Sequence, residues 1–245
     1  MNFTCKYLLL FLFYLTQVQC IVAQNVSLSP SAKLEKKIKL LEVLYDETIE
    51  NNAHLYNGIE YIPYSRNTEG HAYFSTEAPI VGSVTYSNQL YKRVSLQYDL
   101  LYDKVIVEHP IYSSSVQLID KNIKDFSLGD RNFIHLLTDS TKANVSSGFY
   151  ELLYNGKSQC LAKRRKTIIQ RVKNGELQVT FDERSRLFIL KNEKYFLINS
   201  KRDLKNIFQN KSISVSQFIR KNKLSFTQDK ENTMVKVAAF FDEQK

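Results

Sequence analysis

The segment QLYKRVSLQYDL, residues 89–100, decides the fold class because apolar and polar side chains alternate along it. Successive side chains of a strand point to opposite faces of its sheet, so this period of two predicts a strand with one buried and one solvent-facing side. We predict that Tyr91 is a contact residue on the solvent-facing side. The buried side is predicted to carry Leu90, Val94, Leu96, Tyr98 and Leu100, and the other side Tyr91, Arg93, Ser95, Gln97 and Asp99.

The same pattern covers most of residues 59–200, and tight-turn signals separate its candidate strands. Asn155-Gly156 favours a two-residue type I′ hairpin turn, whose central residues both need positive φ, and Asn174-Gly175 marks a second tight turn. Asn192-Glu193 suggests a third turn. Short strands joined by such turns predict an antiparallel meander. The other candidate strands are residues 80–86, 104–109, 114–119, 122–128 and 131–137.

Helical patterns flank the predicted sheet. Over residues 30–52, Pro30 suits the first helical position, and one apolar stripe recurs at spacings of three and four. We therefore predict an α+β fold, mainly β. It is a curved antiparallel meander, like half of a barrel, with the N-terminal helix and C-terminal helices (about residues 201–245) packed on it. The C-terminal start signals are two capping boxes, Ser200 with Asp203 and Ser214 with Gln217, and a single cap, Asp229.

The first 23 residues predict an export signal. Lys6 precedes the apolar run YLLLFLFYL (7–15), and Ala23 is a small residue at the expected cleavage point. The run is too short to cross a bilayer, which needs about 20 apolar residues. We expect residues 1–23 to be removed and residues 24–245 to form a single domain in the periplasm or cell envelope.

The cysteines fit this interpretation. Cys5 and Cys20 lie in the leader, and lipidation of Cys20 is an alternative that the large polar residues 17–19 disfavour. Cleavage after Ala23 leaves Cys160 with no cysteine to pair with in the same chain. We expect Cys160 to be a small buried residue rather than a nucleophile.

The net charge of +9 is unevenly distributed. Residues 24–156 contain 12 basic and 16 acidic residues, whereas residues 157–223 contain 18 basic and five acidic ones. The basic charge is densest at four consecutive residues, Lys163, Arg164, Arg165 and Lys166. On a strand these side chains alternate between two faces, so we expect an edge strand or an overhanging hairpin arm.

Three interpretations of this basic run are open. It can be a solvated strand whose charges prevent edge-to-edge association. It can be an anion-binding surface for an anionic envelope component, such as lipid head groups or polyanionic glycans, or for an acidic protein partner. Nucleic acid ranks last, because the chain has no recognised nucleic-acid-binding motif.

Catalytic and cofactor motifs are weak. The four histidines lack metal-ligand spacing, and seven glycines in 245 residues nearly exclude a phosphate loop or a dinucleotide fingerprint, so we predict no metal and no cofactor. The best ionisable cluster is Asp99, Asp103, Glu108 and His109, which a cleft could use for acid–base chemistry. The favoured alternative is structural, because Asp99 and Asp103 flank a turn in which aspartate bonds its own backbone.

Several longer phrases resemble a known group of proteins. They are LYNGIEYIPY (55–64), EGHAYF (69–74), VGSVTYSNQLYKRVSLQYDLLYDKVIVE (81–108), GFYELLYNGKSQCLAKRRK (148–166) and FIRKNKLSFTQDKENTMVKVAAFFD (218–242). Together they are similar to an uncharacterised family of exported proteins of Gram-negative bacteria that has no assigned activity. The resemblance implies residence in the periplasm or envelope, and it implies no catalytic residue.

Three functions follow as hypotheses. The first is a non-enzymatic envelope protein that binds or scaffolds. The second is a carrier of a hydrophobic ligand or lipid in an open β half-barrel, which needs an apolar cavity of several hundred Å³ inside the sheet. The third is a hydrolase whose site is assembled from dispersed residues.

Overall fold

The computed structural model describes residues 34–39, 53–64, 68–109, 114–138, 145–209 and 214–244. The chain divides into two compact units, Met1–Asn51 and Asn52–Lys245. In the first unit, residues 34–39 are helical, which agrees with part of the helix predicted over residues 30–52. The rest of that helix, the export signal at residues 1–23, Cys5 and Cys20 lie outside the described residues.

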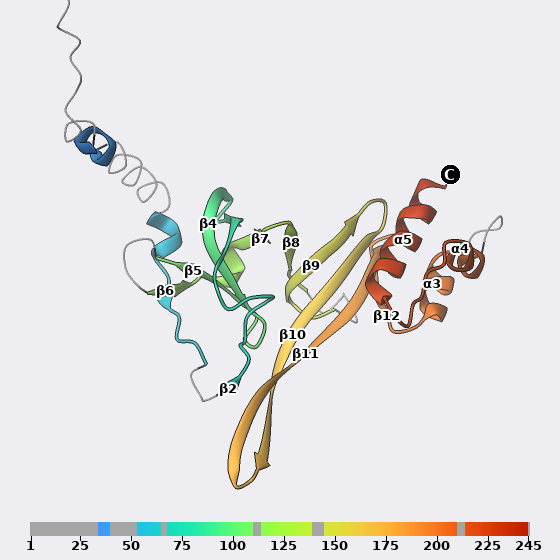
Figure 1. The fold of residues 1–245 in the computed structure, drawn as a ribbon. Coiled ribbons are helices and arrows are strands. Elements are labelled where there is room, and N and C mark those ends of the chain that lie inside the picture. The colour runs from blue at the N-terminus through green and yellow to red at the C-terminus, as the bar shows by residue number, and fades with distance from the viewer. Residues whose placement is uncertain are drawn as a thin grey trace, which may run out of the picture. The chain divides into compact units, whose positions relative to one another are not determined.

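The second unit is built on an open, mainly antiparallel sheet (Figure 1). The strands pair in the order β1-β6-β5-β4-β3-β7-β8-β9-β10-β11-β12, and β2 adds to β11 in parallel. The predicted α+β, mainly β class is confirmed. The strands are β1 (Ile59–Glu60), β2 (Thr68–Glu69), β3 (Ile80–Tyr86), β4 (Gln89–Asp99), β5 (Lys104–Glu108), β6 (Ser115–Gln117), β7 (Ile123–Leu128), β8 (Arg131–Leu136), β9 (Gly148–Asn155), β10 (Gln159–Lys173), β11 (Glu176–Lys191) and β12 (Lys194–Ile198).

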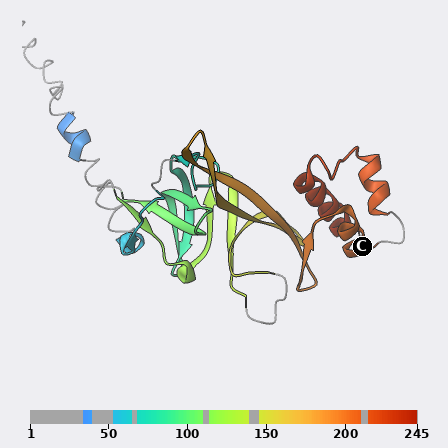
Figure 2. The same ribbon diagram turned by 90° about the horizontal axis from the view of Figure 1, so that it is seen from below.

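Three α-helices follow the sheet and gather beside β9–β12 (Figure 2). They are α3 (Lys201–Ile207), α4 (Val215–Lys221) and α5 (Lys230–Glu243), and two short 3-10 turns, η1 (Ala53–Tyr56) and η2 (Asp120–Asn122), lie earlier in the chain. The predicted caps are present: Ser214 and Gln217 bond each other's backbone N–H groups, and Asp229 accepts from the N–H of Asn232 at 3.0 Å. None of the described helices has the length and apolarity to cross a membrane.

The predicted turns are right in two of three places. Asn174-Gly175 and Asn192-Glu193 are two-residue turns with positive φ at both positions. At Asn155-Gly156 the hairpin forms, but three residues connect its strands and neither Asn155 nor Gly156 has positive φ, so the type I′ prediction is wrong there. The carboxylate of Asp242 on α5 accepts from the N–H and Oγ of Ser158, at 2.7 and 2.9 Å, and this contact favours the longer loop.

A β-bulge at Arg93 corrects the predicted faces of β4. Arg93 has a φ of 56°, and the pairing of β3 with β4 shifts by one residue at this point. An extra residue inverts the alternation of side chains. Tyr91 is therefore buried on the same side as Val94, while Leu90 is exposed. The prediction that Tyr91 is a solvent-facing contact residue is wrong.

Aromatic rings fill the core of β3–β8. Tyr98, Phe126, Phe133 and Phe149 are each at most 2 % exposed, and the centroids of their contacting ring pairs lie 4.7–5.9 Å apart. A second core lies between β10–β12 and the three α-helices, with Cys160, Met234 and Val237 among its buried members. Packing on this second core is what holds the helices to the sheet.

Candidate functional site

Asp99, a predicted acid–base candidate, has a structural role. Its side chain is fully buried, and it accepts hydrogen bonds from the Tyr61 hydroxyl at 2.6 Å and from the N–H groups of Leu101 and Tyr102 at 2.7 and 3.1 Å. Burial and the contact with Asp99 raise the pKa of Tyr61 above its ordinary value. Asp99 thus organises the turn between β4 and β5, as the structural interpretation of the sequence predicts.

The other members of the predicted acid–base cluster are not brought together. Asp103 accepts from the Tyr98 hydroxyl and from Lys163 Nζ, both at 2.5 Å. Glu108 and His109 lie at the opposite end of β5, whose five residues span about 16 Å. The ring of His109 packs there against Tyr56, with centroids 4.8 Å apart. Geometry therefore separates the two aspartates from the histidine.

The basic run of residues 163–166 begins an overhanging hairpin, as predicted. β10 pairs with β11 along its whole length but with β9 only from Gln159 to Ala162, so from Lys163 onward β11 is its only strand partner among the described residues. We call residues 163–186 the hairpin arm. It carries eight basic and three acidic residues.

Three of the four basic side chains in the run are largely buried and bound to the protein. Lys163 donates to Asp103 and to the carbonyl of Phe149, and burial outweighs these contacts to lower its pKa. Lys166 donates to the carbonyls of His71 and Tyr73 at 3.0 and 2.7 Å. Arg164 belongs to the ion-pair network described next, so Arg165 alone of the four is exposed.

An ion-pair network with a buried centre, formed by Arg164 and Glu151, joins the sheet to α5. Arg164 on β10 donates Nε to Glu151 Oε2 at 2.8 Å, and its two terminal nitrogens contact both carboxylate oxygens of Glu231. Arg131 on β8 pairs with the second oxygen of Glu151. Burial lowers the pKa of Arg164, but the hydrogen bonds with Glu231 and the charge of Glu151 outweigh it and raise the pKa above the ordinary value. The network connects β8, β9, β10 and α5.

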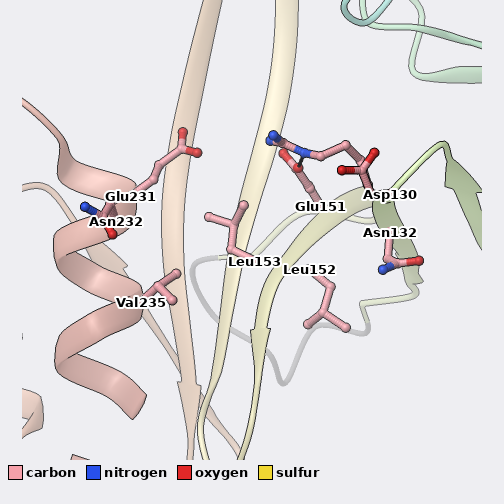
Figure 3. A pocket seen from close by; sticks show the side chains of 9 residues that line it. Asp130, Asn132, Glu151, Leu152, Leu153, Glu231, Asn232 and Val235 are labelled. Carbon is pink, nitrogen blue, oxygen red and sulfur yellow. Dashed lines mark hydrogen bonds and ion pairs between the residues drawn. The ribbon is translucent and has the colours of Figure 1, made fainter. Parts of the chain in front are cut away.

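Three members of the network, Arg131, Glu151 and Glu231, line a cleft of about 310 Å³ (Figure 3). Glu231 on α5 points across the cleft towards the side on which Glu151 lies, and Leu153 and Val235 lie below them. Arginines pair with the charges of Glu151 and Glu231, so these two carboxylates serve mainly to join the sheet to α5. The remaining lining residues are Asp130, Asn132, Leu152 and Asn232.

A smaller cavity of about 200 Å³ lies beside the arm. Its lining includes the aromatic rings of Tyr64, Tyr73 and Phe181 and the imidazole of His71. His71 Nδ1 is buried without a hydrogen-bond partner among the described residues. Burial, followed by the charge of Lys166, lowers the pKa of His71. This cavity can enclose a small ring-shaped or polar group, and Thr68, His71 and Glu77 all line it.

The exposed basic surface lies on one face of the arm. Arg165 is directly opposite Arg184, and Arg186 is the next residue on the same face. All three are exposed, and we call them the arginine face. Arg184 bonds Asp182 at 2.7 Å, whereas Arg165 has no carboxylate within ion-pair distance in the part of the chain that the structure describes.

The arginine face breaks a rule of strand pairing. Like charges directly opposite each other destabilise an antiparallel pair. Arginine guanidinium groups bind phosphate, sulfate and carboxylate through two parallel hydrogen bonds, and such an anion would remove the repulsion. Sequence reasoning selected Arg165 but missed Arg184 and Arg186, because their position depends on the register of two strands.

Comparison with known proteins assigns nothing to these sites. No family model, curated protein or solved structure matches the chain. The resemblance to exported Gram-negative proteins, and the export signal itself, stay predictions. Among the described residues, no three His, Cys, Asp or Glu side chains are grouped so that they could hold a metal ion.

Cys160 should be unreactive in the folded protein. It is completely buried, and burial, with the charge of Asp242, raises its pKa to about 12. At pH 8 about one molecule in ten thousand then carries the thiolate, which is the reactive form. We expect iodoacetamide to label the peptide containing Cys160 at least about 100-fold more slowly in buffer than in urea, as followed by mass spectrometry. Rapid labelling of the folded protein would make Cys160 a candidate nucleophile.

Proposed function

We propose that this protein is an exported, non-enzymatic binding or scaffolding protein of the cell envelope, and that its arginine face holds an anionic partner. The observation that carries the proposal is the pair of exposed arginines, Arg165 and Arg184, placed directly opposite each other. Like charges placed opposite each other repel, and Asp182 offsets only the charge of Arg184, so an anion bound beside Arg165 would be favourable. An anionic envelope component or an acidic protein partner would supply that charge.

The packing of the sheet favours this function over a lipid carrier. A carrier needs an open apolar cavity within the sheet. Here Tyr98, Phe126, Phe133 and Phe149 occupy the core of β3–β8, in contact with one another. Native mass spectrometry of protein extracted from the envelope is therefore expected to give the mass of the bare chain, and a bound lipid would support the carrier instead.

The carboxylates also favour binding over hydrolysis. Asp99, Asp103, Glu151 and Glu231 each accept hydrogen bonds or ion pairs from fixed protein groups. A general acid or base must instead reach the substrate's proton at hydrogen-bond distance. These four carboxylates are thus engaged in supporting the architecture.

Charge reversal on the arginine face tests the proposed function. The double variant Arg165→Glu/Arg184→Glu keeps like charges opposite each other but changes their sign. We expect it to bind heparin, a soluble sulfated polyanion, at least about tenfold more weakly, because each hydrogen bond to a charged group contributes about 1.5–3 kcal/mol. Binding of the unaltered protein should weaken as salt is added. Isothermal titration calorimetry at two salt concentrations measures both effects.

A matched control separates the arginine face from total charge. Arg202→Glu/Lys205→Glu makes the same change in net charge at two exposed residues of α3. This control should retain heparin binding within about twofold, since exposed charges separated by more than a Debye length of about 8–10 Å are largely screened. Equal losses in both variants would contradict a defined site on the arm.

A further inference from the structure

The tip of the hairpin arm is a separate surface from the arginine face. β10 and β11 remain paired to Lys173 and Glu176, where the Asn174-Gly175 turn joins them (Figure 1). β2 covers β11 only at Val179 and Thr180. Every side chain from Gln170 to Gln178 whose exposure is described is exposed. About 23 Å of strand separates Arg165 from Val172.

Two apolar side chains stand exposed at this tip. The pairs Ile168–Phe181, Gln170–Val179 and Val172–Leu177 follow one another on a single face of the arm. Nearer the sheet this face is covered, since Val179 is buried and Phe181 packs against Tyr64. At the tip, Val172 is 74 % and Leu177 is 55 % exposed. The apolar face thus extends beyond the residues that pack against it, and its last pair, Val172 and Leu177, is exposed to solvent.

The size of the tip argues against a protein as its occupant. Val172 and Leu177 offer on the order of 200 Å² of apolar surface, whereas a stable protein interface buries about 800 Å² on each partner. A bilayer needs no such area, because apolar side chains enter its interface individually and basic neighbours add attraction to anionic lipid. Arg171 is adjacent to Val172 in sequence and lies on the other face of the arm, directly opposite the neutral Gln178, with Glu176 as its diagonal neighbour across the strands.

We propose that Val172 and Leu177, at the tip of the hairpin arm, insert into the interface of an anionic lipid bilayer while Arg171 contacts the lipid phosphates. The inference goes beyond the proposed function and uses different residues. With the tip in the bilayer, Arg165 lies about 23 Å of strand away from Val172. This distance exceeds the Debye length at physiological salt, so the arginine face interacts little with the head groups. The arm would then hold a soluble anionic partner next to a membrane.

A tryptophan placed at the tip reports insertion directly. The chain contains no tryptophan, so Leu177→Trp gives a single tryptophan whose emission can be excited apart from that of the tyrosines. On mixing with vesicles of phosphatidylcholine and phosphatidylglycerol, its emission is expected to shift to shorter wavelength and to be quenched by brominated lipid. Val81→Trp, at an exposed position of β3, should show neither change. An unshifted spectrum for Leu177→Trp at saturating vesicle concentration would overturn the inference.

The tip variant Val172→Ser/Leu177→Ser measures the contribution of insertion. We expect its affinity for these vesicles to fall about tenfold or more, because both apolar side chains contribute to partitioning. The thermal midpoint should stay near that of the unaltered protein, since both side chains are exposed. Both proteins are used as the cell produces them, with their N termini checked by mass spectrometry, so that any other hydrophobic segment is present in each.

The two proposals fail in different ways. The tip variant should keep its heparin affinity, and Arg165→Glu/Arg184→Glu should keep tip insertion. If Arg165→Glu/Arg184→Glu abolishes vesicle binding and the tip variant binds vesicles normally, the inference is overturned and the proposed function stands. If both charge-reversal variants lose heparin binding equally while Leu177→Trp inserts into vesicles, the proposed function is overturned and the inference stands. A dimer in analytical ultracentrifugation that the serine substitutions dissociate would mean that a second copy of the chain covers the tip, and it would also overturn the inference.

Discussion

Replacing Arg164 by alanine is expected to lower the free energy of unfolding by about 3–5 kcal/mol, because it leaves a buried carboxylate without its main partner. Glu151 is 1 % exposed, and Arg164 binds it through two nitrogens. The same guanidinium group contacts Glu231 on α5 and the hydroxyl of Ser185. Its loss therefore removes the ionic link between the sheet and α5.

Urea unfolding followed by circular dichroism measures this loss, and Arg184→Ala is the matched control. Arg184 is also an arginine of the hairpin arm in an ion pair, with Asp182, but its side chain is 80 % exposed. An exposed ion pair contributes about 0–1 kcal/mol, so this variant should be nearly as stable as the unaltered protein. Equal effects of the two substitutions would show that the buried network contributes no more than a surface pair.

Arg164→Lys separates the charge from the geometry of the network. Lysine carries the same charge on a single nitrogen, whereas arginine offers five N–H donors in a planar fork. One ammonium group cannot reach Glu151, Ser185 and Glu231 in the arrangement that Arg164 adopts. We expect an intermediate loss of stability. Full stability of Arg164→Lys would mean that charge alone, and not the fork, sets the contribution.

Local signals explain why much of the fold could be predicted from the sequence. The capping residues Ser214 and Gln217 lie three positions apart, and Asn174-Gly175 forms its own turn, so neither depends on distant parts of the chain. Alternation was sufficient to locate β3–β8 within a few residues. It failed at Tyr91, because nothing in the sequence marks the bulge at Arg93: a left-handed φ is more typical of glycine or asparagine.

The candidate sites depend on contacts between distant residues, which the sequence does not display. Arg164 was selected for its charge, but its partners Glu151 and Glu231 lie 13 and 67 positions away and are brought to it by strand register and by the packing of α5. The arginine face likewise requires the pairing of Arg165 with Arg184. The run of charges at residues 163–166 marked the region, but only the folded structure shows that Arg165 alone of the four is exposed.

Replacing Phe133 by alanine is expected to cost about 3–5 kcal/mol of unfolding free energy, because it removes the ring at the centre of the aromatic core. The Phe133 ring contacts those of Phe74, Tyr98 and Phe126, at centroid distances of 5.1, 5.3 and 4.7 Å. Its removal leaves a cavity lined by apolar and aromatic groups. An apolar cavity of this kind stays dry and can bind benzene.

This prediction also tests whether the sheet interior is packed or open. Phe196→Ala is the matched control, because Phe196 on β12 is 36 % exposed and its loss should cost less than half as much. Benzene should partly restore the stability of Phe133→Ala in urea titrations, by binding only the folded state, and should leave the unaltered protein unchanged. If Phe133→Ala is no more harmful than Phe196→Ala, or if benzene stabilises the unaltered protein, the interior is open and the carrier becomes the better-supported function.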